Sequence, residues 1–358
     1  MTAREREPLH GPFAWTGAAL ARDGGWRQRW SPGEVAEIDA ALRRAERRGL
    51  TWDRLSRADF PLDAAAQRLC AISQELEQGR GFAMISGFPV KRYSPAQLRL
   101  IWMGLAHHLG TPVSQDCGGQ LLREIRDQGG DLGARHGQLV SGEGGAEFLS
   151  SKARTYGHGE LRFHTDRADV AGLLAIRQAA RGGFSRIASS VAVHNALLAR
   201  HPDLLELLYR PIHRSRLGEE RGGENLVYPL PVFGLRDGKF TSHYSRTYIE
   251  AAQLCPGTPP LSEHQWQALD LLAELAAELS LEIRLEPGDM QLLNNHVIYH
   301  ARGAFEDRPG GSSGRLLYRV WLSVPNNRPL PKDHAVLWGQ VEAGGLRGGI
   351  GQAPPVST

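Results

Sequence analysis

The sequence has few cysteines, little net charge and no long hydrophobic run, and each absence excludes a class of protein. Its three cysteines, Cys70, Cys117 and Cys255, are widely spaced without a CxxC pair, so we expect reduced, buried thiols rather than a disulfide framework or zinc site. The 42 basic and 39 acidic residues leave a net charge of only +3, which argues against nucleic-acid binding. No apolar stretch is long enough to cross a membrane. We therefore expect a cytoplasmic protein that binds neither nucleic acid nor a membrane.

The chain is long enough to bury one large core. It has 358 residues, of which 41% are hydrophobic, and it contains no internal repeat. Three helix starts are indicated by a serine that is followed three residues later by Glu or Gln. These capping boxes begin at Ser31, Ser94 and Ser262.

Three regions differ in their pattern. We expect residues 1–79 to be a helical segment packed on the core, residues 80–328 to form a strand-rich core, and residues 329–358 to be a Pro/Gly-rich tail of low order. Within the core, the glycine-rich polar segment 118–155 is long for an idle connection. It is therefore predicted to be a mobile lid beside the functional site.

The most informative motif is His164-Thr165-Asp166. If residues 161–165 are extended, side chains at i and i+2 leave the strand on the same face, so His164 and Asp166 can bind one ion together. His300, far downstream, can complete the set. Two imidazoles and one carboxylate on one face of an octahedral metal form the ligand set of non-haem Fe(II) oxygenases. Taken alone, the tripeptide is as readily explained by a surface histidine beside a solvated aspartate as by a metal site.

Further motifs accompany these residues in a fixed order along the chain. They are Gly182-Gly183-Phe184-Ser185, the turn Pro287-Gly288-Asp289, and the pair Arg315 and Arg319 at the start of an apolar strand. With His164, Asp166 and His300, they resemble the taurine dioxygenase and clavaminate synthase-like family of Fe(II)/2-oxoglutarate-dependent oxygenases. The resemblance covers residues 80–325.

The resemblance implies a role for each site residue. His164, Asp166 and His300 would bind the iron, while Arg315, with the Ser185 hydroxyl, would hold the distal carboxylate of 2-oxoglutarate. Arg319 would contact either 2-oxoglutarate or an anionic group of the substrate. At position 296 the family often has arginine, whereas this chain has histidine. His296 therefore stays open as an alternative distal ligand.

The resemblance also implies a fold and an activity. The fold would be mainly β, with a double-stranded β-helix (jelly roll, cupin-like) core and N-terminal and inserted helices. The enzyme would be a dioxygenase that uses Fe(II), O2 and 2-oxoglutarate to hydroxylate or otherwise oxidise a small molecule. 2-Oxoglutarate would be converted to succinate and CO2. The substrate would carry an anionic group if Arg319 faces it, and the oligomeric state is not indicated.

Three alternatives stay open from the sequence. A dioxygenase of the same family could cleave alkylsulfonates or sulfate esters. A jelly-roll protein could bind a metal as a sensor and catalyse nothing, although such a sensor has no need of the Arg315 and Ser185 carboxylate clamp. A zinc-dependent hydrolase or isomerase on a related cupin barrel is the third, and the metal preference would distinguish it.

Overall fold

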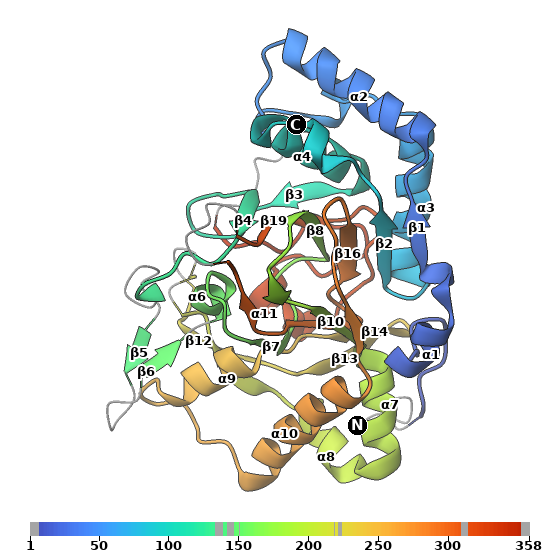
Figure 1. Cartoon of the computed structure of the whole chain (residues 1–358). Coiled ribbons are helices and arrows are strands. Elements are labelled where there is room, and N and C mark those ends of the chain that lie inside the picture. Colours follow the sequence, from blue (N-terminus) through green and yellow to red (C-terminus); the bar gives the residue numbers. More distant parts are fainter. Residues whose placement is uncertain are drawn as a thin grey trace.

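Helices and strands both contribute extensively to this chain (Figure 1). The computed structural model describes residues 7–132, 139–141, 147–149, 151–217, 219–220, 224–308 and 314–351. The longest helices have 16 residues, whereas the longest strands have 8. The architecture is therefore mixed, rather than mainly β as expected, because long helices cover the sheets on two sides.

A seven-stranded sheet forms the larger of the two main β layers. Its strands run in the order β1-β2-β16-β8-β19-β3, and β4 also pairs with β19. All pairs are antiparallel except β1 with β2. The bounds are β1 (Arg27–Arg29), β2 (Phe82–Ser86), β3 (Thr111–Val113), β4 (Leu122–Ile125), β8 (Val170–Arg177), β16 (Met290–Asn294) and β19 (Leu316–Ser323).

A four-stranded antiparallel sheet forms the second main layer, in the order β15-β10-β17-β7. Its strands are β7 (Leu161–His164), β10 (Ser185–Ser189), β15 (Leu281–Ile283) and β17 (Ile298–Arg302). The remaining strands form two-stranded ribbons: β5 (Leu139–Ser141) with β6 (Glu147–Leu149), β9 (Arg181–Gly182) with β18 (Phe305–Glu306), β11 (Ile212–Ser215) with β12 (Val227–Leu230), and β13 (Phe233–Arg236) with β14 (Lys239–Ser242).

The helices form two groups around these sheets. In Figure 1, α2 and α4 lie above the large sheet and α3 lies to its right beside β2, whereas α7, α8 and α10 lie below the small sheet. The α-helices are α1 (Gly17–Arg22), α2 (Pro32–Arg47), α3 (Ala64–Gln78), α4 (Pro95–Leu109), α6 (Ser151–Thr155), α7 (Ser190–Arg200), α8 (Pro202–Leu208), α9 (Arg246–Gln253), α10 (Glu263–Glu278) and α11 (Ala335–Trp338). Short 3-10 turns occupy Gly24–Trp26, Arg57–Asp59, Val90–Arg92 and Lys332–His334.

All three predicted capping boxes are confirmed. Ser31, Ser94 and Ser262 each accept a hydrogen bond from the backbone N–H three residues on, and the Glu or Gln side chain there accepts one from the serine N–H. Because each box satisfies two N–H groups that the first turn leaves unpaired, α2, α4 and α10 begin where the sequence places them.

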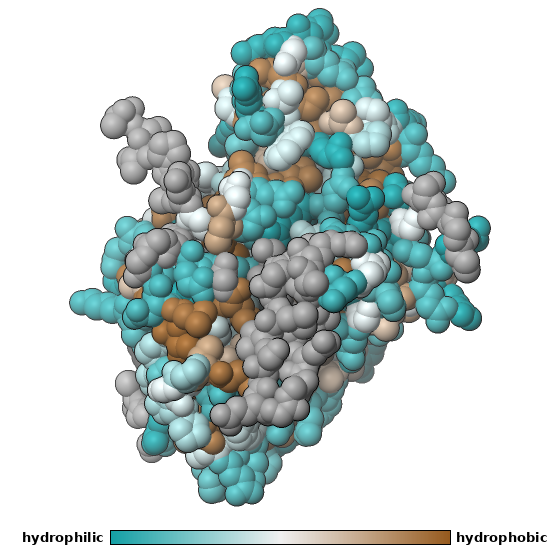
Figure 2. All heavy atoms as spheres, turned by 90° about the vertical axis from the view of Figure 1, so that its left-hand side faces the viewer, coloured by the Kyte–Doolittle hydropathy of each residue, from teal (hydrophilic) through white to brown (hydrophobic). Residues whose placement is uncertain are grey.

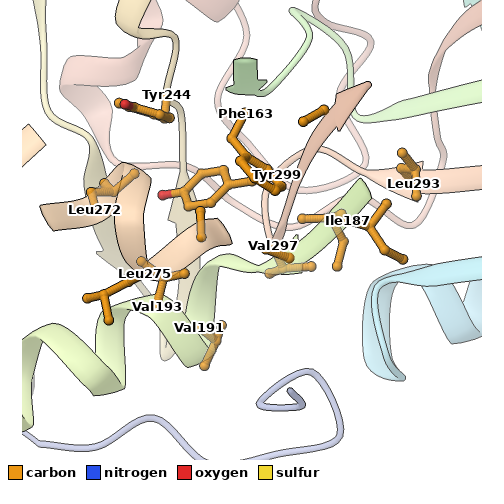
Figure 3. Packing of buried hydrophobic residues seen from close by; sticks show 14 of the residues in the cluster. Phe163, Ile187, Val191, Val193, Tyr244, Leu272, Leu275, Leu293, Val297 and Tyr299 are labelled. Carbon is orange, nitrogen blue, oxygen red and sulfur yellow. The ribbon is translucent and has the colours of Figure 1, made fainter. Parts of the chain in front are cut away.

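Two hydrophobic clusters account for most of the core. One packs α2, α3 and α4 on the outer face of the large sheet, with Trp102 and Phe60 among its fully buried members. The other lies between the two sheets and continues under α7, α8 and α10. Figure 3 shows part of it, where Ile187 of β10 lies beside Leu293 of β16, and the Tyr299 ring of β17 extends towards Leu272 of α10.

Successive side chains of β19 point to opposite faces of the large sheet and so belong to different hydrophobic clusters. Leu316, Tyr318 and Val320 belong to the cluster under the N-terminal helices, whereas Leu317 belongs to the cluster between the sheets. Since alternate side chains of a strand share a face, Arg319 points to the same side as Leu317. The large sheet therefore presents polar side chains towards the smaller sheet.

The surface shown in Figure 2 is mainly hydrophilic, with separate hydrophobic patches between the hydrophilic regions. No helix in the described part of the chain combines the length and the apolar character needed to span a bilayer.

The segment after Pro329 differs from the tail of low order that the sequence suggests. Leu330, Trp338 and Ile350 are buried, and the Arg347 side chain has no exposed surface and forms a salt bridge of 2.7 Å with Asp169. The many glycines here make tight turns rather than disorder, because Gly344, Gly348 and others adopt positive φ angles. Residues 352–358 lie outside the described part.

The three cysteines lie nearer the surface than expected. Cys70 and Cys117 are free, but both are exposed, and Cys255 is half-buried, so the prediction of buried thiols is wrong. Each lies on a turn or on the outer side of a helix, where the core does not reach. Within the predicted lid, residues 118–155, the structure describes β4, β5, β6 and α6, whereas residues 133–138, 142–146 and 150 lie outside the described ranges.

Candidate active site

His164, Asp166 and His300 come together although two strands far apart in the sequence carry them. His164 ends β7 and His300 lies on β17, and the two residues are directly opposite in the antiparallel ladder. Opposite side chains in such a pair lie side by side on one face. The three ligand atoms lie within 4.8 Å of one another, and both histidine Nε2 atoms are 3.7 Å from an Asp166 carboxylate oxygen. In the described residues, this is the one cluster able to hold a metal.

Hydrogen bonds orient two of the three side chains. The His164 Nδ1–H donates to the Arg162 carbonyl over 2.8 Å, which leaves the Nε2 lone pair for a metal. Trp321 donates its indole N–H to Asp166 Oδ2 over 2.7 Å. The buried Nδ1 of His300 has no hydrogen-bond partner among the described residues, so β17 sets the position of that ring.

The electrostatics of the cluster suit metal binding. Burial lowers the pKa of His164, and burial together with His164 lowers the pKa of His300 to about 3. Burial alone would raise the pKa of Asp166, but Arg319 and the two histidines outweigh it and hold the pKa below its ordinary value. Neutral imidazoles and an ionised carboxylate are the protonation states that ligate a divalent cation. The donor set therefore fits Fe(II).

The alternative ligand His296 has another task. Its Nε2 lies 2.9 Å from Asp169 Oδ1, its Nδ1 lies 2.9 Å from the Thr241 hydroxyl, and the side chain is buried. Asn295 beside it accepts a hydrogen bond from the Asp166 N–H and donates to the Ala168 carbonyl. These contacts make Asn295 a positioning residue for the turn that carries Asp166, and they favour His300 over His296 as the distal ligand.

All six site residues predicted from the sequence line one cavity of about 590 Å³. Besides His164, Asp166 and His300, its lining includes Ser185, Arg315 and Arg319, with leucines from both sheets between them. We call it the Arg315 cavity. A buried arginine at one end and a metal cluster at the other, separated by apolar walls, can accommodate a short dicarboxylate.

Arg315 is buried without a carboxylate partner in the described part of the chain. Its Nε and Nη1 atoms have no surface exposure and no hydrogen bond there, and burial followed by the nearby Arg302 lowers its pKa to about 9. Gly183 makes room for this side chain. It has a φ of +70°, and a Cβ there would lie 3.1 Å from Arg315 Nε. An incoming carboxylate would satisfy the guanidinium bidentately.

Gln291 is a candidate binding residue that sequence reasoning missed. Ser185 donates its hydroxyl to Gln291 Oε1 over 2.8 Å, and the buried Gln291 Nε2 has no partner among the described residues. Since Ser185 is already engaged, the amide N–H group is the free donor. The available signal was a polar residue in the middle of the apolar strand Met290–Asn294, on the same face as Leu293.

We expect Ser185→Ala and Gln291→Leu each to raise the KM for 2-oxoglutarate, because each removes one neutral partner of the dicarboxylate. The loss of one such hydrogen bond, about 0.5–1.5 kcal/mol, corresponds to roughly two- to tenfold. Steady-state kinetics at varied 2-oxoglutarate would measure it. Met290→Leu is the matched control, since Met290 faces the N-terminal helices. An unchanged KM in both variants would remove Ser185 and Gln291 from the co-substrate site.

A second cavity meets the Arg315 cavity at the cluster. It has a volume of about 660 Å³ and also contains His164, Asp166, Thr155 and Arg319 in its lining. Its other polar members include Arg167, Arg216, Glu219, Tyr228 and Tyr248. We call it the Arg216 cavity. Arg319 lines both cavities, donates from Nε to Gln115 over 2.7 Å, and has Nη1 3.5 Å from Asp166.

Comparison with known proteins agrees with this geometry. The family described as "Taurine catabolism dioxygenase TauD, TfdA family" matches residues 47–321. FR-33289 synthase of Streptomyces rubellomurinus is 34% identical over 349 residues, which cover 94% of this chain and 97% of that protein. The taurine hydroxylase-like protein SAT17 of Stachybotrys chartarum is 30% identical over 320 residues, or 87% of this chain and 79% of that protein.

Solved structures share the fold at lower sequence identity. Asparagine oxygenase in complex with Fe(II), hydroxyasparagine and succinate has a TM-score of 0.62 and 16% identity, covering 83% of this chain and 93% of that chain. The non-heme iron oxygenase OrfP with Fe and alpha-ketoglutaric acid has a TM-score of 0.58 and 16% identity, covering 83% and 94%. The chain belongs to the TauD/TfdA family and is an Fe(II)- and 2-oxoglutarate-dependent dioxygenase.

Proposed function

We propose that this dioxygenase hydroxylates a small molecule held in the Arg216 cavity, while 2-oxoglutarate occupies the Arg315 cavity. The observation that carries the proposal is that the two cavities share His164, Asp166 and Arg319. 2-Oxoglutarate and the substrate would then approach each other only at the metal cluster. Coupled oxidation of two substrates requires such an arrangement.

His164, Asp166 and His300 would hold the iron, which supplies the activation of O2 and the oxidising power for the C–H bond. The chain itself supplies binding and orientation. Arg315 would bind the distal carboxylate of 2-oxoglutarate, with Ser185 and Gln291 beside it. Apolar walls exclude water from the Arg315 cavity, which strengthens these charged contacts.

We propose the double-stranded β-helix as the description of the core. In support, the two main sheets pack face to face through a shared hydrophobic cluster, and the site residues project between them, as in two-sheet jelly rolls. Residues 80–328 would form this core, and residues 1–79 would pack on it. Helix α3 fits that division, since it packs against α4 and the large sheet.

Cleavage of an alkylsulfonate or sulfate ester is the alternative activity within the family. This cleavage would use the same iron site and would differ from hydroxylation only in what happens to the hydroxylated product. The position of Arg319 in the lining of both cavities is compatible with either activity. Membership of an enzyme family argues against the non-catalytic sensor. The set of two histidines and one carboxylate favours Fe(II) over a zinc hydrolase.

We expect the purified enzyme to convert 2-oxoglutarate to succinate only when Fe(II) and O2 are present. The rate should rise when the true substrate is added, because substrate binding completes the site. Chromatographic detection of succinate across a panel of small molecules would measure this, and sulfite release from alkylsulfonates would identify the alternative. Succinate formation that Zn(II) supports equally well, or none at all with Fe(II), would overturn the proposal.

A further inference from the structure

We infer that the Arg216 cavity contains a subsite for an oxyanion group of the substrate, formed by Arg167 and Arg216. The inference rests on the proposed function, because it assigns the substrate to this cavity. The two arginines lie away from Arg315 and are not members of the Arg315 cavity. They define a substrate class: small molecules with a carboxylate, sulfonate or phosphonate group and an oxidisable carbon within reach of the metal cluster.

Arg167 and Arg216 are buried and share an acid. Glu224 lies 3.1 Å from Arg167 Nη2 and 3.6 Å from Arg216 Nε. Only 9% of the Arg167 side chain and 3% of the Arg216 side chain are exposed. Two guanidinium groups therefore share the Glu224 carboxylate, and solvent reaches neither of them well.

Both guanidinium groups have donors that no described residue satisfies. Arg167 Nε and Arg216 Nη1 are completely buried, and neither has a hydrogen-bond partner in the described ranges. Leaving a charged donor unpaired in a buried site is costly, and an oxyanion can satisfy it while also balancing the charge. Hydrogen bonds from an ionised donor are stronger to an ionised acceptor than to a neutral one, so these two guanidinium groups favour an anion over a neutral ligand.

Arg216 is held in place by contacts with its own chain. It donates from Nε to the Asn225 carbonyl over 3.0 Å and from Nη2 to the Val336 carbonyl over 2.7 Å. Its guanidinium carbon lies 4.2 Å from the centre of the Tyr228 ring. A guanidinium fixed in this way loses little entropy when it binds a ligand.

Further charged groups lie in or beside the cavity, and among them Glu220 also interacts electrostatically with Arg216. Arg123 is paired with Asp116 at 2.5 Å. Asp166 belongs to the metal cluster, and Glu219 accepts a hydrogen bond from the Tyr248 hydroxyl over 3.3 Å. Burial raises the pKa of Tyr228, and burial followed by Glu219 raises that of Tyr248. Both phenols therefore stay neutral, and the Tyr228 hydroxyl can donate to an anion, whereas the Tyr248 hydroxyl already donates to Glu219.

The test is binding of simple oxyanions to the enzyme loaded with Fe(II) and saturating 2-oxoglutarate under nitrogen. Saturating 2-oxoglutarate keeps the Arg315 cavity filled, so binding of the titrated anion reports on the Arg216 cavity. Calorimetric titration with acetate, methanesulfonate and methylphosphonate separates planar from tetrahedral oxyanions, and acetamide and dimethyl sulfone are the neutral counterparts. We expect at least one oxyanion to bind and its neutral counterpart not to bind.

Arg167→Gln and Arg216→Gln should each raise the Kd for that oxyanion about tenfold or more, since each removes a charge-assisted donor pair. Arg167→Lys should recover part of the affinity. Arg181→Gln is the control, because Arg181 is exposed and pairs with Glu306. Should Arg216→Gln fail to fold, given its backbone contacts, the Arg167 variants decide. Equal binding of anion and neutral counterpart, or unchanged binding in Arg167→Gln, would overturn the inference.

The two proposals fail separately. If wild-type enzyme makes succinate but no oxyanion binds, the subsite is wrong and the proposed function stands. If oxyanions bind in the predicted manner but the enzyme never makes succinate with Fe(II), the proposed function is wrong and the anion site stands.

Discussion

Replacing His300 by alanine is expected to abolish both stoichiometric iron binding and succinate formation. The same result is expected for His164→Ala and Asp166→Ala, because the three ligand atoms lie within 4.8 Å of one another and the described residues offer no spare donor beside them. Iron content after anaerobic reconstitution, measured by atomic absorption or a chelator assay, tests this directly. Activity should fall with it to the background of the metal-free protein.

His296→Ala is the matched control for these variants. It removes a buried imidazole four residues from His300, but one that contacts Asp169 and Thr241 instead of the cluster. The loss leaves Asp169 without one partner, so about 1–3 kcal/mol of stability should be lost and the Tm should fall. Iron binding should persist in the folded protein. A His296 variant without iron beside a His300 variant that retains it would show that the distal ligand is His296.

Arg315→Lys is expected to raise the KM for 2-oxoglutarate by roughly ten- to a hundredfold. Lysine keeps the charge but loses the planar fork, and one hydrogen bond to a charged group contributes on the order of 1.5–3 kcal/mol. The kcat at saturating 2-oxoglutarate should change much less, because the guanidinium acts on binding. Arg186→Lys is the control, since Arg186 lies next to Ser185 on β10 but pairs with Glu160. An unchanged KM in Arg315→Lys would remove Arg315 from the co-substrate site.

Arg315→Met separates function from stability at the same position. In the described residues Arg315 forms no salt bridge, and two of its nitrogens are buried without a partner. Replacing such a group by an apolar side chain is often neutral or stabilising. The Tm of the variant without 2-oxoglutarate should therefore not fall, whereas the rise in Tm that 2-oxoglutarate causes in the wild type should disappear. Thermal denaturation with and without 2-oxoglutarate measures both.

Local signals were sufficient to predict several elements and two members of the metal cluster, His164 and Asp166. The capping boxes at Ser31, Ser94 and Ser262 specify helix starts through contacts three residues apart, so no tertiary information is needed. The i, i+2 spacing of His164 and Asp166 depends only on extended backbone. His300 was different, because its pairing with His164 depends on the register of two distant strands, and only the family resemblance indicated it.

Tertiary contacts decided the features that the sequence did not reveal. Gln291 becomes a candidate donor only because β16 faces the cavity beside Ser185. Arg167 and Arg216 acquire their meaning by sharing Glu224, which no spacing rule predicts. The C-terminal segment was misjudged for the same reason. Its glycines and prolines are typical of a loose tail, whereas the partner that holds Arg347 in place is Asp169, far earlier in the chain.

The placement of this late segment has a consequence for how the enzyme is made. The backbone N–H of Gly349 bonds to the Arg167 carbonyl, and β8 pairs with both β16 and β19. A ribosome that has synthesised His164 and Asp166 must therefore complete most of the remaining chain before these residues gain their neighbours. Until then the edges of β8 stay unpaired, which exposes the nascent chain to aggregation. The complete set of iron ligands therefore exists only after β17 with His300 has been synthesised and has paired with β7.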